Sequence, residues 1–417
     1  MTDGRRHDVS DSDGLADNDG LADSDTDRIR GASPAVIRKA VRDRDPFPGT
    51  RGFAGRLCAT PNGAGPVLVR DVLGREPLFV ERAATNPTAP GAWGFDPTTL
   101  TEPRAVSAGT ILDRGGETEI WPLPTPEPVD SVAGQRAVDE AVRAVLDEMS
   151  EDRGEHNERG LAVAFSGGVD SGLVAAGVPD APCYVAGFEG SHDVAAAREA
   201  AAAMNRELRV VELTHDDVVR AIPAIADATG RRNAMDLNIA VPLYLTAEAA
   251  AADGFDRLAL GQGADELFGG YSKVVEPTSD HRVDADTVRG ARTETVRTLP
   301  SQLERDVLTL RTAGVEPVTP LLDDRIVEAA LRLPDELLAT GEERKIALRR
   351  AASEYLPASV ASADKKAVQY GTYVAREIDR LARRNGFKRR MDDHVGQYID
   401  SLLDEERPSE KTARGGP

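Results

Sequence analysis

The chain has 417 residues, enough for two or three domains with a sizeable hydrophobic core. Its formal net charge is -20, and only seven of its 51 basic residues are lysines. This acidic balance argues against a protein that coats nucleic acid, which needs a basic face, and is typical of halophilic proteins. No apolar run is long enough to cross a membrane and the N-terminus lacks a signal-peptide core, so we expect a soluble, cytoplasmic protein.

The first predicted segment is an acidic leader over residues 1–28, which is too poor in apolar residues to fold and is expected to be disordered. Residues 29–121 contain short strands and glycine turns, which predict a small β-rich region. A proline-rich linker is expected over residues 122–132, followed by an amphipathic helix. The last segment, residues 405–417, is expected to be a frayed, disordered tail.

Between residues 161 and 261 apolar strands alternate with helices. The strands are predicted at 161–165, 183–188, 208–213 and 257–261. The helices are predicted at about 171–177, 193–204, 215–229 and 238–252. This alternation predicts an α/β fold whose parallel sheet is covered on both faces and binds ligands at the carboxyl ends of its strands. A mostly helical part is expected from 285 to about 390.

The segment 161–171, L-A-V-A-F-S-G-G-V-D-S, combines an apolar strand, a glycine turn and a helix start. Backbone N–H groups and hydroxyls there can surround a pyrophosphate, and they come from Ser166, Gly167, Gly168 and Ser171. Asp170 can hold Mg²⁺ between phosphates. No Gly-Lys-Ser/Thr follows, so this is not a Walker A loop. The string resembles the signature of the ATP pyrophosphatase superfamily, whose members cleave ATP between the α and β phosphates.

A second string, L-A-L-G-Q-G-A-D-E-L-F-G-G-Y over residues 258–271, also begins as a buried strand and ends in glycines. It resembles the second signature of the synthetase domain of the asparagine synthetase family. Asp265 and Glu266 place two carboxylates beside the turn, where a metal ion or a substrate ammonium could bind. Further segments resemble the same family in the same order, and they are 236–245, 314–323, 343–349, 355–360 and 365–369. The resemblance covers about residues 135–385.

This resemblance implies an adenine nucleotide alpha hydrolase-like (ATP pyrophosphatase) domain over residues 133–395 with a helical C-terminal part. It implies that ATP activates the β-carboxylate of aspartate as an acyl-adenylate, with release of pyrophosphate, before ammonia attacks. The implied cofactors are ATP and Mg²⁺. Metal would be held by Asp170 and Asp265.

The resemblance also implies roles for individual side chains. The expected catalytic residues are Lys345, Gln262, Asp265, Glu266 and Arg305. The expected ATP-binding residues are Ser166, Gly167, Gly168, Asp170, Ser171, Gly187, Asp193, Gly261 and Lys365. Two alternatives stay open at this stage: Asp193 could be a helix cap, and the run Glu304-Arg305-Asp306 could be an exposed helix face.

The β-rich region resembles a glutaminase domain through residues 65–80, which are similar to the segment R-D-x-x-G-x-x-P-L-Y-Y. An intact domain of that kind has a nucleophilic cysteine directly after the initiator methionine, whereas this chain has Thr2 there and an internal Cys58. The resemblance therefore implies a degenerate, inactive glutaminase-like region. Ammonia would come from solution or from a separate glutaminase partner, and the family resemblance allows a homodimer.

Two departures from the family pattern bear on the chemistry. Gln262 stands where the family has a glutamate thought to assist ammonia attack, and it cannot act as a base at neutral pH. Val318 replaces the arginine of G-V-E-x-R. Three readings therefore stay open: an asparagine synthetase-type ligase, a relative that joins another carboxylate to another amine, and a catalytically decayed ATP-binding regulator.

Overall fold

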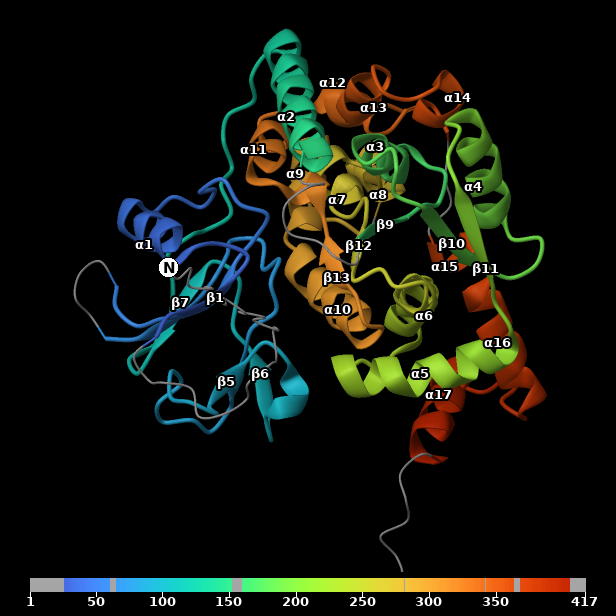
Figure 1. The fold of residues 1–417 in the computed structure, drawn as a ribbon, viewed down its shortest axis with the longest axis horizontal. Helices are drawn as coiled ribbons and strands as arrows, with labels where there is room; N and C mark the ends of the chain where they lie inside the picture. The colour runs from blue at the N-terminus through green and yellow to red at the C-terminus, as the bar shows by residue number, and fades with distance from the viewer. Residues whose placement is uncertain are drawn as a thin grey trace, which may run out of the picture.

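Two regions of different architecture make up the part of the chain that the structure, a computed structural model, describes (Figure 1). The described residues are 26–60, 65–151, 160–280, 282–341, 343–363 and 368–405. The leader lies outside them up to residue 25, and so does the tail beyond residue 405.

The N-terminal region contains two antiparallel sheets. The larger sheet has the order β1-β2-β3-β7-β8, with β1 (Arg28–Arg30), β2 (Ala54–Leu57), β3 (Val67–Arg70), β7 (Thr110–Asp113) and β8 (Gly116–Glu119). The smaller sheet has the order β5-β4-β6, with β4 (Phe79–Glu81), β5 (Trp93–Gly94) and β6 (Pro103–Ala105). Two helical segments accompany them, α1 (Pro34–Asp43) and η1 (Pro97–Thr99). The strand β1 begins at the last residue of the expected leader.

The second region is organised by a parallel sheet with the order β11-β10-β9-β12-β13. Its strands are β9 (Leu161–Ala164), β10 (Cys183–Gly187), β11 (Leu208–Glu212), β12 (Arg257–Ala259) and β13 (Glu316–Val318). From β9 the chain adds β10 and β11 on one side and later β12 and β13 on the other. A topological switch point therefore lies at the carboxyl end of β9, where open α/β sheets bind ligands.

Apolar side chains on both faces of this sheet explain why it is buried. Along β9, Ala162 belongs to one hydrophobic cluster and Val163 to another, and in β10 Tyr184 and Val185 divide in the same way. Because successive strand residues point to opposite faces, each face has its own core. The parallel sheet covered on both faces, expected from the sequence, is confirmed.

The helices between the strands follow the predicted pattern closely. They are α2 (Ser131–Glu151), α3 (Val169–Gly177), α4 (His192–Ala203), α5 (His215–Thr229) and α6 (Ala234–Ala252). Helix α5 begins with a capping box between Thr214 and Asp217 and ends at Gly230, which has a φ of +66°. Helix α6 begins four residues before the predicted 238, because the side chain of Asn233 caps its first turn.

The remainder of the described chain is mostly helical, as expected. Around the second glycine string lie α7 (Ala264–Phe268), α8 (Ser272–Val275), η2 (Pro277–Ser279), α9 (Val288–Val296), α10 (Leu299–Thr312) and η3 (Pro320–Leu322). Beyond them lie α11 (Asp324–Leu331), α12 (Asp335–Leu338), α13 (Ile346–Ala352), α14 (Ala358–Ala361), α15 (Val368–Gly371), α16 (Val374–Arg384) and α17 (His394–Glu405). Helix α17 extends past residue 395, where the domain was expected to end.

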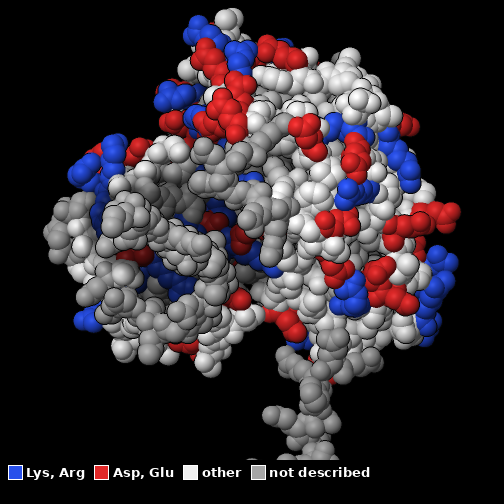
Figure 2. All heavy atoms as spheres, in the orientation of Figure 1, with Lys and Arg blue, Asp and Glu red and all other residues white. Residues whose placement is uncertain are grey.

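The N-terminal region lies beside β13 and α10, drawn in orange in Figure 1. Two ion pairs join the regions: the buried Arg75 contacts Asp324 at 2.7 Å, and the partly buried Arg311 of α10 contacts Glu76 at 3.0 Å. On the face in Figure 2, acidic and basic side chains are interspersed around α2. Arg325 of α11 and Glu148 of α2 form an ion pair at 2.6 Å. Across the described residues, no helix combines the length and apolarity needed to cross a bilayer.

Candidate active site

A cavity of about 510 Å³ lies at the carboxyl ends of β9, β10 and β12. On one side it is lined by the first glycine loop. Gly167 adopts a φ of +79°, and a Cβ there would lie 2.6 Å from the backbone oxygen of Ala196, so only glycine fits this turn. The Ser171 Oγ accepts a hydrogen bond from the backbone N–H of Ser166 at 3.2 Å. Gly168 occupies the N-cap position of α3 and supplies no side-chain cap, and residues 168–171 of the loop and first turn line the cavity.

The second glycine loop packs directly against the first. A Cβ on Gly261 would lie 2.7 Å from the Cβ of Asp170, so the two loops approach as closely as their backbones allow. Gly263 has a φ of +87° and starts α7, which carries Asp265 and Glu266 into the cavity lining. Both glycine strings therefore face one crevice, as their positions after two parallel strands predict.

Lys345 bridges the two loops. Its Nζ lies 2.7 Å from Oδ2 of Asp170 and 2.7 Å from Oδ1 of Asp265. Burial opposes the charge of this ammonium, but the two carboxylates outweigh it and raise the pKa of Lys345, which is therefore a cation at neutral pH. Its backbone lies in the left-handed region with a φ of +58°, which is uncommon for a residue with a side chain and marks a constrained functional position.

The same two carboxylates were predicted to hold Mg²⁺. The described residues contain no group of three or more His, Cys, Asp or Glu side chains arranged to hold a metal ion. A pair of carboxylates nevertheless fits Mg²⁺, because this ion is commonly held by one or two carboxylates together with phosphate oxygens and water. Because Asp170 and Asp265 contact the same ammonium nitrogen, both carboxylates face the same part of the cavity.

Glu266 is a buried carboxyl group that lines this cavity. Burial and the neighbouring charge of Asp265 raise the pKa of Glu266 to about 7. The hydroxyl of Tyr271 donates a hydrogen bond to Glu266 Oε1 at 2.5 Å, and burial together with the Glu266 charge raises the pKa of Tyr271, so that hydroxyl keeps its proton. Glu266 can therefore change its protonation state near neutral pH.

Gln262 is held by a chain of polar groups from α10 and α6. Its Nε2 donates a short hydrogen bond to Asp306 Oδ2, while Arg305 Nε donates to the other Asp306 oxygen at 2.7 Å. Arg305 Nη1 also donates to Asp236 at 2.9 Å. Arg305 and Asp306 are 5% and 6% exposed and line the cavity, so the alternative of an exposed helix face is wrong for these two residues.

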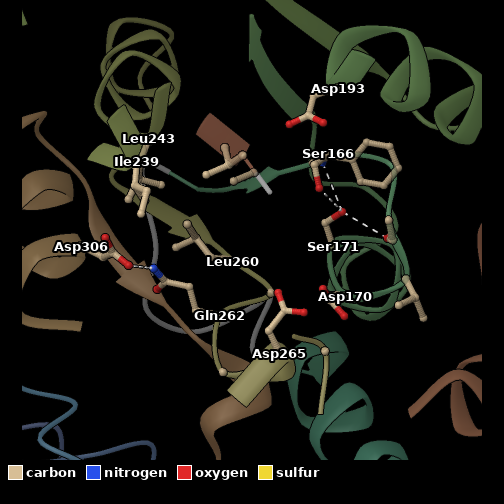
Figure 3. Close-up of a pocket in the computed structure, with 18 of the residues that line it drawn as sticks. Ser166, Asp170, Ser171, Asp193, Ile239, Leu243, Leu260, Gln262, Asp265 and Asp306 are labelled. Carbon is tan, nitrogen blue, oxygen red and sulfur yellow. Dashed lines mark hydrogen bonds between the residues drawn. The ribbon is translucent and has the colours of Figure 1, made fainter. Parts of the chain in front are cut away.

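An apolar wall completes the cavity. Figure 3 shows Ile239 and Leu243 of α6 and Leu260 of the second loop on the side opposite Ser166 and Ser171. The other side carries Asp193, which is 2% exposed. Ser191 is the N-cap of α4 and Asp193 is the second residue of that helix, so the alternative of a helix cap is wrong for Asp193. Asp193 lines the cavity. The cavity thus combines a helix N-terminus without a side-chain cap, a cation between carboxylates and an apolar surface.

Most of the residues singled out from the sequence converge on this cavity. Those that line it are Ser166, Gly168, Asp170, Ser171, Asp193, Gly261, Gln262, Asp265, Glu266, Arg305 and Lys345. Gly167 and Gly187 do not line the cavity themselves, and both pack against α4 or its N-cap. Lys365 lies outside the described residues. The roles of all these residues stay predictions.

The sequence reasoning did not single out several lining residues: Ile239, Leu243, Arg344 and Arg349. The two arginines lie on either side of Lys345 in the segment 343–349, which was singled out as a whole. Their basic side chains next to the expected catalytic lysine are the signal from which they could have been proposed as site residues. The apolar residues carried no signal, because an apolar position on a helix looks the same whether it faces a core or a cavity.

A helix N-terminus aimed into a cavity at a switch point defines a class of α/β proteins that bind anionic ligands there. Within this class the chain belongs to the asparagine synthase family, which it matches over residues 141–291 and 279–411. The match includes the second glycine string, the polar chain around Gln262 and Lys345.

Individual relatives share about half of their length with this chain. It is 28% identical over 278 residues to a candidate glutamine-hydrolysing asparagine synthetase of Methanocaldococcus jannaschii, covering 58% of this chain and 50% of that protein. It is 29% identical over 231 residues to asparagine synthetase B of Escherichia coli, covering 49% and 40%. Among solved structures, an NMN synthetase from Francisella tularensis aligns over 65% of this chain and 94% of its own at a TM-score of 0.32 and 10% identity.

Proposed function

We propose that the protein is an ATP-dependent amide ligase of the asparagine synthetase type, which activates the β-carboxylate of aspartate and transfers it to ammonia. The observation that carries the proposal is the arrangement of Lys345 opposite the uncapped N-terminus of α3. Lys345 lies between Asp170 and Asp265, within the same cavity as the glycine loop. Family membership supports the same chemistry.

In the first proposed step, a carboxylate oxygen of aspartate attacks the α-phosphorus of ATP. The bond from that phosphorus to the bridging oxygen of the β-phosphate breaks, and pyrophosphate leaves. The backbone N–H groups of Gly167, Gly168 and the first turn of α3 stabilise the leaving charge, and the Lys345 ammonium donates to it. Mg²⁺, when bound by Asp170 and Asp265, would neutralise phosphate charge.

In the second proposed step, ammonia attacks the acyl carbon, AMP leaves with its oxygen, and the nitrogen loses a proton. Gln262 can hydrogen-bond to the nucleophile but cannot accept this proton. Glu266 is the proposed acceptor, because its pKa of about 7 allows it to take up a proton at neutral pH.

Ammonium, and not glutamine, is the proposed nitrogen source of the isolated chain. Cys58, the cysteine of the glutaminase-like region, follows β2, and burial raises the pKa of its thiol. A thiol with a raised pKa forms little thiolate, which is the reactive species. A separate protein that releases ammonia from glutamine is a possible supplier in this proposal.

The test is pyrophosphate release by the full chain with Mg-ATP at high salt, with and without L-aspartate, and with ammonium or glutamine as nitrogen donor. We expect release that depends on aspartate, and asparagine formation with ammonium only. Absence of aspartate-dependent release with a folded protein that binds ATP would refute asparagine synthesis. If the protein is a ligase, Lys345→Ala should abolish pyrophosphate release. If the protein is a regulator that only senses ATP, the wild-type protein and Lys345→Ala should both bind ATP and neither should release pyrophosphate.

A second candidate is a ligase that joins another carboxylate to another amine. The observation that favours it is Gln262, which stands at the family's glutamate position and adjoins the apolar wall of Leu260 and Leu243 (Figure 3). Pyrophosphate release that is stimulated by other carboxylic acids and not by aspartate would support this candidate.

A further inference from the structure

Arg75 is a buried cation at the border between the N-terminal region and the rest of the chain. Its side chain is only 2% exposed. The guanidinium reaches both regions: Nε donates to Asp71 Oδ1 at 2.8 Å, and Nη1 donates to the backbone oxygen of Leu322 at 2.8 Å and to Asp324 Oδ1 at 2.7 Å. One side chain from the turn after β3 therefore holds η3 and the start of α11.

The two carboxylates at this border are themselves held in place. Asp71 accepts hydrogen bonds from the backbone N–H groups of Phe53 and Leu73. Asp324 accepts from the backbone N–H of Thr50 at 2.7 Å and donates its own N–H to the Thr50 oxygen at 2.9 Å. A planar guanidinium can satisfy several acceptors in fixed directions, whereas a lysine ammonium cannot span the same set. The contact is thus specific for arginine.

Leu322, whose carbonyl Arg75 holds, packs on the second glycine loop. A Cβ on Gly263 would overlap Cδ2 of Leu322 and lie 2.7 Å from its Cγ. Leu322 is fully buried, and it belongs to the same hydrophobic cluster as Leu267 of α7. The position of Leu322 therefore limits where the backbone at Gly263 can lie, and with it the neighbouring Gln262.

We propose that Arg75 is a positioning residue of the candidate active site. By holding Leu322 and Asp324, Arg75 fixes the position of the loop 261–263, on which Leu322 packs. The glutaminase-like region is thereby a structural part of the ligase site. This role gives the region a function that does not depend on glutamine hydrolysis. The consequence for catalysis rests on the proposed function, whereas the positioning of the loop does not.

The positioning is tested by hydrogen–deuterium exchange of the full chain, read by mass spectrometry, which needs no enzyme activity. In Arg75→Lys we expect peptides covering residues 258–272 to exchange about tenfold faster, with peptides over 161–177 unchanged. Leu322→Ala leaves the ion pairs of Arg75 in place and should produce the same local increase, so it serves as the test if Arg75→Lys does not fold. The control is Arg325→Lys, because Arg325 follows Asp324 directly in the chain but pairs with Asp323 and Glu148, which lie outside the N-terminal region.

Unchanged exchange over 258–272 in folded Arg75→Lys or in Leu322→Ala, or the same increase in Arg325→Lys, would overturn the proposal. If the wild-type protein releases pyrophosphate, Arg75→Lys should lower kcat at least tenfold and leave the KM for ATP within about twofold, because the loop 166–168 is untouched. A wild-type protein without activity would refute the proposed function and leave the exchange result as the test of positioning.

Discussion

Replacement of Lys345 by methionine tests the core of the proposed chemistry. Methionine keeps an unbranched stem of similar length and removes the charge, so the backbone and the packing of the side chain change little. The two carboxylates that now face the ammonium, Asp170 and Asp265, would then face each other without a cation between them.

The expected size of the effect follows from the geometry. At 2.7 Å and an effective dielectric constant of about 20, each charge pair has a gross Coulomb energy of about 6 kcal/mol. Desolvation of the ammonium cancels a large part of that attraction in the ground state. When pyrophosphate leaves, negative charge develops in front of Lys345, and loss of one such preorganised donor lowers kcat about 10²- to 10³-fold, or about 3–4 kcal/mol.

The assay is steady-state pyrophosphate release with saturating Mg-ATP and aspartate, together with ATP binding measured by calorimetry. Lys39→Met is the matched control, because Lys39 lies on α1 and its side chain is 65% exposed. Release by Lys345→Met at more than about a tenth of the wild-type rate, with ATP binding intact, would refute the role of Lys345 in stabilising the leaving group.

Three further predictions concern Glu266 and Gly261 of this site and Cys58 of the N-terminal region. Because the pKa of about 7 favours the protonated form of Glu266 in the folded protein, its contribution to stability is full below about pH 4.5 and is lost as the pH rises through 7. In urea unfolding, Glu266→Gln should remove a loss of about 2.5 kcal/mol between pH 5 and pH 8, and an unchanged difference would contradict the assignment. Gly261→Ala should push the two glycine loops apart at Asp170 and lower pyrophosphate release by at least tenfold in the kinetic assay, whereas a wild-type rate would show that the loops tolerate separation. Cys58→Ser should leave ammonium-dependent amide formation unchanged, since Cys58 does not line the cavity. If the wild-type protein forms amide from glutamine and Cys58→Ser does not, the glutaminase-like region is active and the prediction is contradicted.

The parallel sheet could be predicted because β9 and β10 at its centre are runs of buried, mostly apolar residues and each is followed by a helix. Strand β13 could not, since the sequence Glu316-Pro317-Val318 has a charge and a proline and becomes a strand only by pairing with β12. The glycine loops were recognisable from their residues, because an anion cradle needs positions without a Cβ. The apolar wall of the cavity carried no such signal.

The sequence by itself determined the local chemistry of this protein: where a strand turns into a helix around glycines, and which carboxylates and lysine accompany those turns. Only the tertiary structure decided that Lys345 lies between Asp170 and Asp265, that Arg305 and Asp306 turn inward to hold Gln262, and that Arg75 reaches Leu322. The physical reason is distance along the chain. Strand propensity and turn chemistry act over a few neighbouring residues, whereas these contacts join segments that meet only after the sheet and its covering helices have formed.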